Sequence, residues 1–129
     1  MRPILCVGET LEQREAGKAA EIVENQVKAG LTSLHNVDEL VIAYEPVWAI
    51  GTGVPATPEI PIEMMGGVIL GALVELYGDN TAGQVPLLYG GSVTPGNVDG
   101  FVREECVHGA LVGGASLQAD QFVEIVRIT

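Results

Sequence analysis

Short apolar runs and longer helical patterns alternate along this chain, and the alternation repeats four times. The apolar runs, which have the length and composition of buried strands, are residues 4–7, 39–44, 85–89 and 109–112. The helices predicted after them cover residues 10–31, 57–77, 96–103 and 119–127. A strand followed by a helix, four times, predicts an α/β fold in which helices cover a parallel sheet. Four such units form either a small open sheet or half of an eight-stranded barrel.

The first predicted helical region carries two specific sequence signals. Thr10, followed three residues later by Gln13, has the pattern of a capping box at a helix start. Val23, Val27 and Leu31 then recur at the spacing of one helix face. This region therefore begins at a defined residue and buries one side against the sheet.

The charge of the chain limits its partners. Its 129 residues include 6 Lys+Arg against 17 Asp+Glu, a formal charge of −11. Nucleic acid and anionic membranes are not expected partners, because neutralising phosphates requires clustered cations. An acidic surface also keeps a protein soluble. A bound anionic substrate would have to be held by local dipoles, because the electrostatic field of the net negative charge repels it.

Cysteine and histidine residues suggest neither a disulfide framework nor a metal site. Cys6 and Cys106 lie far apart in the sequence, and His35 and His108 lack the spacing of metal ligands. No signal peptide is expected at the N-terminus. The longest apolar stretch, residues 64–74, is shorter than the roughly 20 residues that a membrane-spanning helix needs. A cytoplasmic protein without metal or organic cofactor is expected.

Unusual residues follow the predicted strands. Glu45 comes directly after the second strand, and glycine-rich loops at 90–92 and 113–114 follow the third and fourth. In parallel α/β folds, ligands bind at this carboxyl edge of the sheet. Glycine between a strand and a helix lets backbone N–H groups approach an anion closely. Each glycine pair alone is equally compatible with a plain tight turn, but together with Glu45 they favour a phosphate site beside a catalytic carboxylate.

Five sequence segments resemble the triosephosphate isomerase family. The longest, residues 43–53, reads Ala-Tyr-Glu-Pro-Val-Trp-Ala-Ile-Gly-Thr-Gly. Residues 88–93 read Leu-Tyr-Gly-Gly-Ser-Val, and residues 109–117 read Gly-Ala-Leu-Val-Gly-Gly-Ala-Ser-Leu. Residues 3–11 and 14–18 match as well. The resemblance covers essentially the whole chain but only strands five to eight of that family's TIM barrel, so it implies that residues 1–129 are a single half-barrel domain.

The resemblance implies an activity and a set of site residues. The activity is the interconversion of dihydroxyacetone phosphate and glyceraldehyde 3-phosphate, a step of glycolysis and gluconeogenesis. Glu45 would be the base that moves a proton between two substrate carbons, and residues 46–56 would be a mobile lid that excludes water. The resemblance further assigns phosphate binding to Gly51, Ser92, Gly113 and Gly114, an apolar clamp around Glu45 to Ile50 and Leu111, and latching of the closed lid to Tyr89 and Ser92.

Other groups of that family's active site have no counterpart in this chain. The family's Asn and Lys after its first strand and its electrophilic His after its fourth strand belong to the other half of the barrel. An isolated half should be weakly active or inactive, because losing one charge-stabilising group costs about 100- to 1,000-fold in rate. The expected partner is an N-terminal half-barrel chain or a second copy of this chain, as a dimer. The alternative function is a non-catalytic, phosphate-binding or structural half-barrel homo-oligomer.

Two segments depart from the family pattern. Pro55 stands in the lid hinge and fixes its backbone φ, which puts lid motion in doubt. The helix predicted after the cap at Thr57 carries the pair Gly66 and Gly67, which costs roughly 1 kcal/mol per residue in helix propensity. That helix is also apolar nearly all round, which indicates either an additional interface or a departure without functional meaning.

Three residues near the predicted site are interpreted as structural. Glu9 follows the first strand and is expected to be a structural carboxylate close to the site. Trp48 is expected to pack within the lid and not to contact a ligand. Cys6 is expected to be a small, buried core residue.

Overall fold

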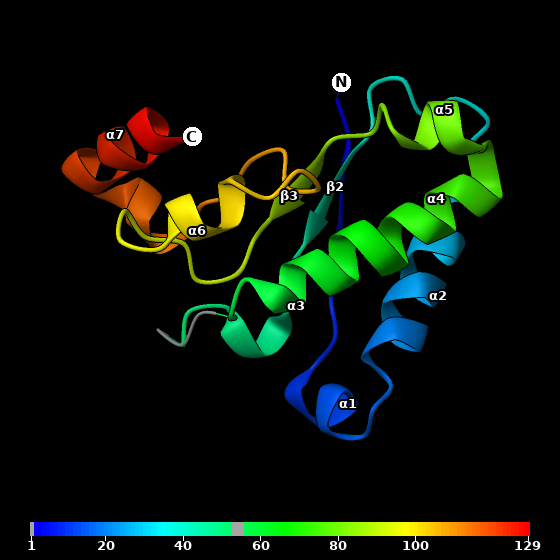
Figure 1. Ribbon diagram of the computed structural model, residues 1–129, viewed down its shortest axis with the longest axis horizontal. Coiled ribbons are helices and arrows are strands. Elements are labelled where there is room, and N and C mark those ends of the chain that lie inside the picture. Colours follow the sequence, from blue (N-terminus) through cyan, green and yellow to red (C-terminus); the bar gives the residue numbers. More distant parts are fainter. Residues whose placement is uncertain (1, 53–55) are drawn as a thin grey trace.

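The sheet of this protein is parallel and three-stranded, in the order β1–β2–β3 (Figure 1). The structure is a computed structural model that describes residues 2–52 and 56–129. The strands are β1 (Ile4–Val7), β2 (Val41–Tyr44) and β3 (Leu87–Tyr89). Their register aligns Cys6 with Ala43, and Ala43 with Leu88. The parallel α/β prediction and the first three predicted strands are confirmed.

The fourth predicted strand, residues 109–112, does not form as a regular strand. The segment runs beside β3 and makes one parallel bridge, between Tyr89 and Ala110. The Leu111 N–H donates to the Tyr89 carbonyl (2.8 Å), and the Tyr89 N–H donates to the Gly109 carbonyl (3.0 Å). Within the described residues, no further strand pairs with the outer side of this segment. A strand supported on one side by only a few hydrogen bonds stays short.

One face of the edge strand β1 is open to solvent. Side chains alternate between the two faces of a strand, and Leu5 and Val7 point to the face that the helices cover. Ile4 and Cys6 point to the other face, where Ile4 is 47% exposed and Cys6 is also exposed. The expectation that Cys6 is a buried core residue is therefore wrong for this chain, because nothing in the described residues covers this side of the sheet edge.

Helices and short turns follow the strands, but the helical region predicted at residues 10–31 is divided by a turn at residues 16–17, and a short helix at residues 79–82 was not predicted. They are α1 (Leu11–Glu15), α2 (Ala19–Leu31), a 3₁₀ turn (Val47–Ala49), α3 (Glu59–Pro61), a π-helical segment (Ile62–Ile69), α4 (Leu70–Tyr77), α5 (Asp79–Ala82), α6 (Val98–Val102), a second 3₁₀ turn (Gly114–Leu117) and α7 (Ala119–Ile128). The predicted capping box is confirmed, since the Gln13 N–H donates to the Thr10 hydroxyl and the Thr10 N–H donates to the Gln13 side chain.

The hydrophobic core lies between the helices and one face of the sheet. In α2, Val23 and Val27 are fully buried and Leu31 is nearly so, as their spacing predicts. Ile42 and Tyr44 of β2 point into the same core. Figure 1 shows α2 beside the long helix that ends in α4, and α7 at the other end of the molecule. This packing covers one face of the sheet and leaves its carboxyl edge for the loops.

Residues 59–77 form one continuous helix with a π-helical middle. The predicted cap at Thr57 is wrong, because the helix begins at Glu59 and no described side chain caps it. Gly66 and Gly67 lie in the π-helical segment, where low helix propensity favours a departure from α geometry. A Cβ on Gly66 would lie 3.3 Å from the Cys106 sulfur, so this glycine also allows close packing.

The same helix is long and apolar enough to cross a membrane by length and composition alone. Its inner face, however, belongs to the protein core, with Met64, Met65, Ile69 and Leu73 at most 1% exposed. Core helices pass the same length and hydropathy test, so the helix is explained by its packing.

Candidate functional site

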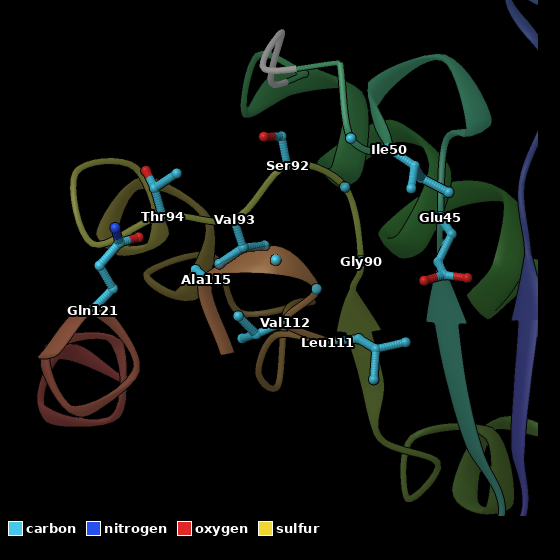
Figure 2. A pocket seen from close by; sticks show the side chains of 14 residues that line it. Glu45, Ile50, Gly90, Ser92, Val93, Thr94, Leu111, Val112, Ala115 and Gln121 are labelled. Carbon is cyan, nitrogen blue, oxygen red and sulfur yellow. The ribbon is translucent and has the colours of Figure 1, made fainter. Parts of the chain in front are cut away.

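A cavity of about 380 Å³ opens at the carboxyl edge of the sheet (Figure 2). Glu45 stands at one side of it, beside Gly90 at the end of β3, and Gln121 of α7 stands at the other. All of the predicted site residues except Tyr89 line it. These are Glu45, Ile50, Gly51, Ser92, Leu111, Gly113 and Gly114. Loops that follow three different strands of the predicted fold therefore meet in one cavity.

The Glu45 side chain is held where β2 ends. Its backbone N–H donates to the Val7 carbonyl at 2.7 Å, which continues the pairing of β2 with β1. A Cβ on Gly90 would lie 2.6 Å from the Glu45 Cγ and 2.9 Å from its Oε1. Since side chains do not approach that closely, position 90 must be glycine for the carboxylate to lie across the end of β3. The glycine that looked like part of a tight turn thus makes room for Glu45.

The opposite wall of the cavity consists mainly of backbone. Gly113 and Gly114 begin a 3₁₀ turn, and their N–H groups donate to no acceptor among the described residues. Ser92 lies nearby, with its carbonyl held by the Asn97 side chain at 2.8 Å. Gly51, on the lid side, has a φ of +67°, which glycine adopts without strain. Free N–H groups at the start of a helical turn favour an anion.

The only charged residue that lines the cavity, within the described part of the chain, is Glu45. Among the described residues, no Lys or Arg contributes to its walls. No three described His, Cys, Asp or Glu side chains gather as a metal site would require. His35 and His108 lie away from this cavity, and the His108 Nδ1 accepts the Leu87 N–H at 3.0 Å.

Ile50 and Leu111 flank the Glu45 carboxylate (Figure 2). Leu111 is partly buried, whereas Ile50 is 46% exposed. Leu111 is therefore packed against the fold, whereas the Ile50 side chain is open to solvent. The predicted lid, residues 46–56, can be followed only in part, because residues 53–55, including Pro55, lie outside the described residues.

Tyr89 does not line the cavity but lies buried beneath it. Its ring stacks on Phe101 with 4.2 Å between ring centroids. Its hydroxyl is buried and has no hydrogen-bond partner in the described residues. Burial raises the pKa of this phenol, while the backbone of Ala56, at the end of the lid, acts in the opposite direction. A buried hydroxyl needs a hydrogen-bond partner, and the backbone of Ala56 lies close enough to lower its pKa.

Glu9 is fully buried behind the site and has three partners. Its carboxylate accepts hydrogen bonds from Arg14 Nε (2.7 Å), from the Tyr44 hydroxyl (3.0 Å) and from Trp48 Nε1 (2.9 Å). Arg14 also lies 5.6 Å from the Trp48 ring centre. Burial lowers the pKa of Arg14, but its interactions with Glu9 and Tyr44 raise it above its usual value overall. This network ties Trp48, in the predicted lid, to the end of β2 and the start of α1, as a structural role for Glu9 implies.

We expect the fold to lose stability above about pH 10, the pKa of an exposed tyrosine, because of Tyr44. Burial and then the Glu9 charge raise the pKa of Tyr44, so its phenol ionises more readily in the unfolded chain. Stability is therefore complete below that pH and falls as pH rises through the folded pKa. Urea unfolding between about pH 9 and pH 11 measures this loss. In Tyr44→Phe the pH dependence should be weaker, and an unchanged slope would refute this role.

The sequence interpretation did not predict that Cys6 lies close to Glu45. Partial burial, followed by the charge and hydrogen bonding of Glu45, raises the pKa of the Cys6 thiol. Register could have indicated this contact, since Cys6 aligns with Ala43, two residues before Glu45. Thr94 and Gln121 also line the cavity without any clear sequence signal.

The Cys6 thiol provides a probe of the Glu45 carboxylate. In Glu45→Gln the negative charge that raises the thiol pKa is removed, while the amide oxygen can still accept a hydrogen bond, so more thiolate should form near neutral pH. Alkylation of Cys6 should therefore become several-fold faster, measured by mass spectrometry in a Cys106→Ser background. An equal alkylation rate with Glu45 or Gln would show that the two side chains do not interact.

The family model for triosephosphate isomerase matches residues 1–129. A triosephosphate isomerase from Lactococcus lactis is 52% identical over 128 residues, which cover 98% of this chain and 50% of that protein. Those from Syntrophotalea carbinolica and Roseiflexus castenholzii are 48% and 50% identical; the matches cover 96% and 98% of this chain and 50% of each of those proteins. This chain therefore spans about half the length of the curated relatives that it matches, and it belongs to the triosephosphate isomerase family as a counterpart of the C-terminal half.

Proposed function

We propose that this chain is the half of a triosephosphate isomerase that carries the catalytic base and the phosphate site. The observation that carries the proposal is one cavity that holds both a strand-end carboxylate, Glu45, and the free N–H groups of Gly113 and Gly114. The phosphate end of a phosphorylated three-carbon substrate would bind such N–H groups. Its carbonyl end would need a base to move the proton. The enzyme would act in the cytoplasm on dihydroxyacetone phosphate and glyceraldehyde 3-phosphate.

In the proposed reaction, Glu45 removes a proton from the carbon beside the substrate carbonyl and returns it to the former carbonyl carbon. The proton of the neighbouring hydroxyl passes to the former carbonyl oxygen, so that ketone and aldehyde exchange places. The phosphate is held by Ser92 and by N–H groups of Gly51, Gly113 and Gly114, whose dipoles stabilise its negative charge. Lid closure brings Ile50 against Leu111 and excludes water from the carboxylate. The buried Tyr89 hydroxyl supports a latch role, because it lies next to the backbone of Ala56, at the end of the proposed lid.

The proposed site still needs a donor for the substrate carbonyl oxygen, where negative charge develops during the reaction. No Lys, Arg or His lines the cavity within the described residues. We propose that an N-terminal half-barrel supplies these groups and completes residues 1–129, which form a single half-barrel domain. The two bare edges, at β1 and at the segment after His108, together with the exposed Ile4 and Cys6, support this docking.

Complementation tests the proposed function. We expect turnover of glyceraldehyde 3-phosphate to be at least about 100-fold faster in a mixture of this chain with an N-terminal half-barrel than for this chain alone, because each missing charge-stabilising group costs that much or more. The N-terminal half can be the part of the Lactococcus lactis relative that precedes the matched segment. A mixture that assembles without gaining turnover would refute the proposal.

The second candidate is a homodimer that binds phosphate without catalysis. The observation that favours it is that both bare edges are parallel, so the edge after His108 can pair with β1 of a second copy. Such a dimer would have Glu9 and Glu45 but no cation at the carbonyl oxygen. A light-scattering mass of twice 13.5 kDa, with phosphate binding and no turnover after an N-terminal half is added, would favour this candidate.

A further inference from the structure

Gly8 leaves the sheet directly after β1, and a side chain from α2 takes over its backbone hydrogen bonds. The Gly8 N–H donates to the Gln26 Oε1 at 2.8 Å, and the Gln26 Nε2 donates to the Gly8 carbonyl at 3.1 Å. One amide side chain thus satisfies both polar groups of a residue that the β-ladder no longer holds. Its neighbours in α2, Val23 and Val27, are fully buried and apolar.

The peptide that Gln26 holds lies directly against the loop of the catalytic base. A Cβ on Gly8 would collide with the Glu45 carbonyl oxygen, so only glycine permits this approach. On either side of Gly8, the Val7 carbonyl accepts the Glu45 N–H (2.7 Å) and the Glu9 carbonyl accepts the Val47 N–H (3.0 Å). A rotation of the Gly8 peptide would therefore move both of these acceptors.

The same peptide leads into the network that ties Trp48 to the end of β2. Glu9 follows Gly8 in the chain, and its carboxylate accepts the Trp48 Nε1–H at 2.9 Å. Gln26 is connected to this network by two hydrogen bonds to Gly8. Two hydrogen bonds fix the orientation of the Gly8 backbone as well as its distance from α2. The plain alternative is that Gln26 merely satisfies two polar groups, which would stabilise the fold without affecting the position of Glu45.

We propose that Gln26 is a positioning residue, which sets the Glu45 backbone and the Trp48 end of the lid by holding the Gly8 peptide. The inference rests on the proposed role of Glu45 as the base, and it assigns Gln26 no contact with substrate. Displacement of a catalytic group by about 1 Å can cost on the order of 100-fold in rate. Loss of this hold should therefore lower kcat much more than it raises KM.

Gln26→Glu distinguishes positioning from simple stability. A protonated carboxyl both donates and accepts, as the amide does, whereas an ionised one only accepts and repels the Gly8 carbonyl. We expect kcat of the completed barrel, relative to wild type at the same pH, to be about tenfold or more lower at neutral pH and to recover as the pH falls. The matched control is Asn25→Asp, the same chemical change at the exposed neighbouring position, which should show no such pH dependence.

Trp48 is the only tryptophan, so its emission spectrum gives a second readout in this chain alone. In Gln26→Glu the spectrum should shift at neutral pH and return toward wild type on acidification. Gln26→Met, which removes both hydrogen bonds without adding charge, should show the shift and the lower kcat at every pH. Wild-type kcat and emission in both Gln26 variants would overturn the inference. An inactive wild-type assembly would instead refute the proposed function and leave the emission test of Gln26 in force.

Discussion

Glu45→Gln should lower kcat of the completed barrel by about 100- to 10,000-fold, the usual contribution of general acid–base catalysis. Glutamine has nearly the same shape, so it fits against Gly90 and leaves the cavity unchanged. It cannot accept the substrate proton, because its amide is not basic. Since the phosphate site is separate from the carboxylate, KM should change little. Steady-state kinetics of wild-type and variant assemblies at equal concentration measure both constants.

The matched control for this prediction is Glu39→Gln. Glu39 is an exposed acid that precedes β2, at the end of the strand opposite Glu45, so neutralising it should leave kcat unchanged. Both variants should retain wild-type secondary structure by circular dichroism. If Glu45→Gln retains more than about a tenth of the wild-type kcat, the base lies elsewhere, because proton abstraction by a positioned carboxylate contributes more than that.

Glu9→Ala should have the largest effect on stability, a loss of about 3 kcal/mol or more, as expected when one partner of a buried ion pair is removed. The change would leave the Tyr44 hydroxyl and the Trp48 Nε1–H without their acceptor and the Arg14 charge without its counter-ion. Arg14 remains 22% exposed, so water relieves part of this cost. A loss of this size is a large fraction of the 5–15 kcal/mol typical of a small domain.

Urea unfolding of this chain, followed by circular dichroism, measures the loss in Glu9→Ala. Glu12→Ala serves as the control, because Glu12 is an exposed acid in the first turn of α1, where a favourable dipole contribution is below about 1 kcal/mol. Equal losses in the two variants would show that the buried network does not stabilise the start of the lid.

The sequence predicted the parallel sheet and which residues would gather at its carboxyl edge. Glu45 and the glycine pair at 113–114 stand out because strand ends and short loops are local patterns. The regular strand at 109–112 was wrongly predicted, because an apolar run does not reveal whether a neighbouring strand is present to pair with it. The predicted burial of Cys6 is wrong for the same reason, because the residues that would bury it lie beyond the described edge of the sheet.

Sequence patterns do not predict hydrogen bonds between side chains that are far apart in the chain. Nothing in the spacing of Arg14 and Trp48 reveals that both bind the Glu9 carboxylate, because that meeting depends on how α1 and the lid fold back over the sheet end. The sequence indicates only part of the reason for the π-helical segment. The pair Gly66 and Gly67 indicates a weak helix, but the close approach of Cys106 to Gly66 is a property of the packing.

Titration of this chain with an N-terminal half-barrel is the most direct test of the proposed function. Turnover of glyceraldehyde 3-phosphate and mass by light scattering should be measured on the same samples. We predict negligible turnover from either half alone, and a rise that saturates at a one-to-one ratio as the mass reaches that of a whole barrel. A one-to-one assembly without turnover, or full turnover by this chain alone, would contradict the assignment of this chain as the base-carrying half.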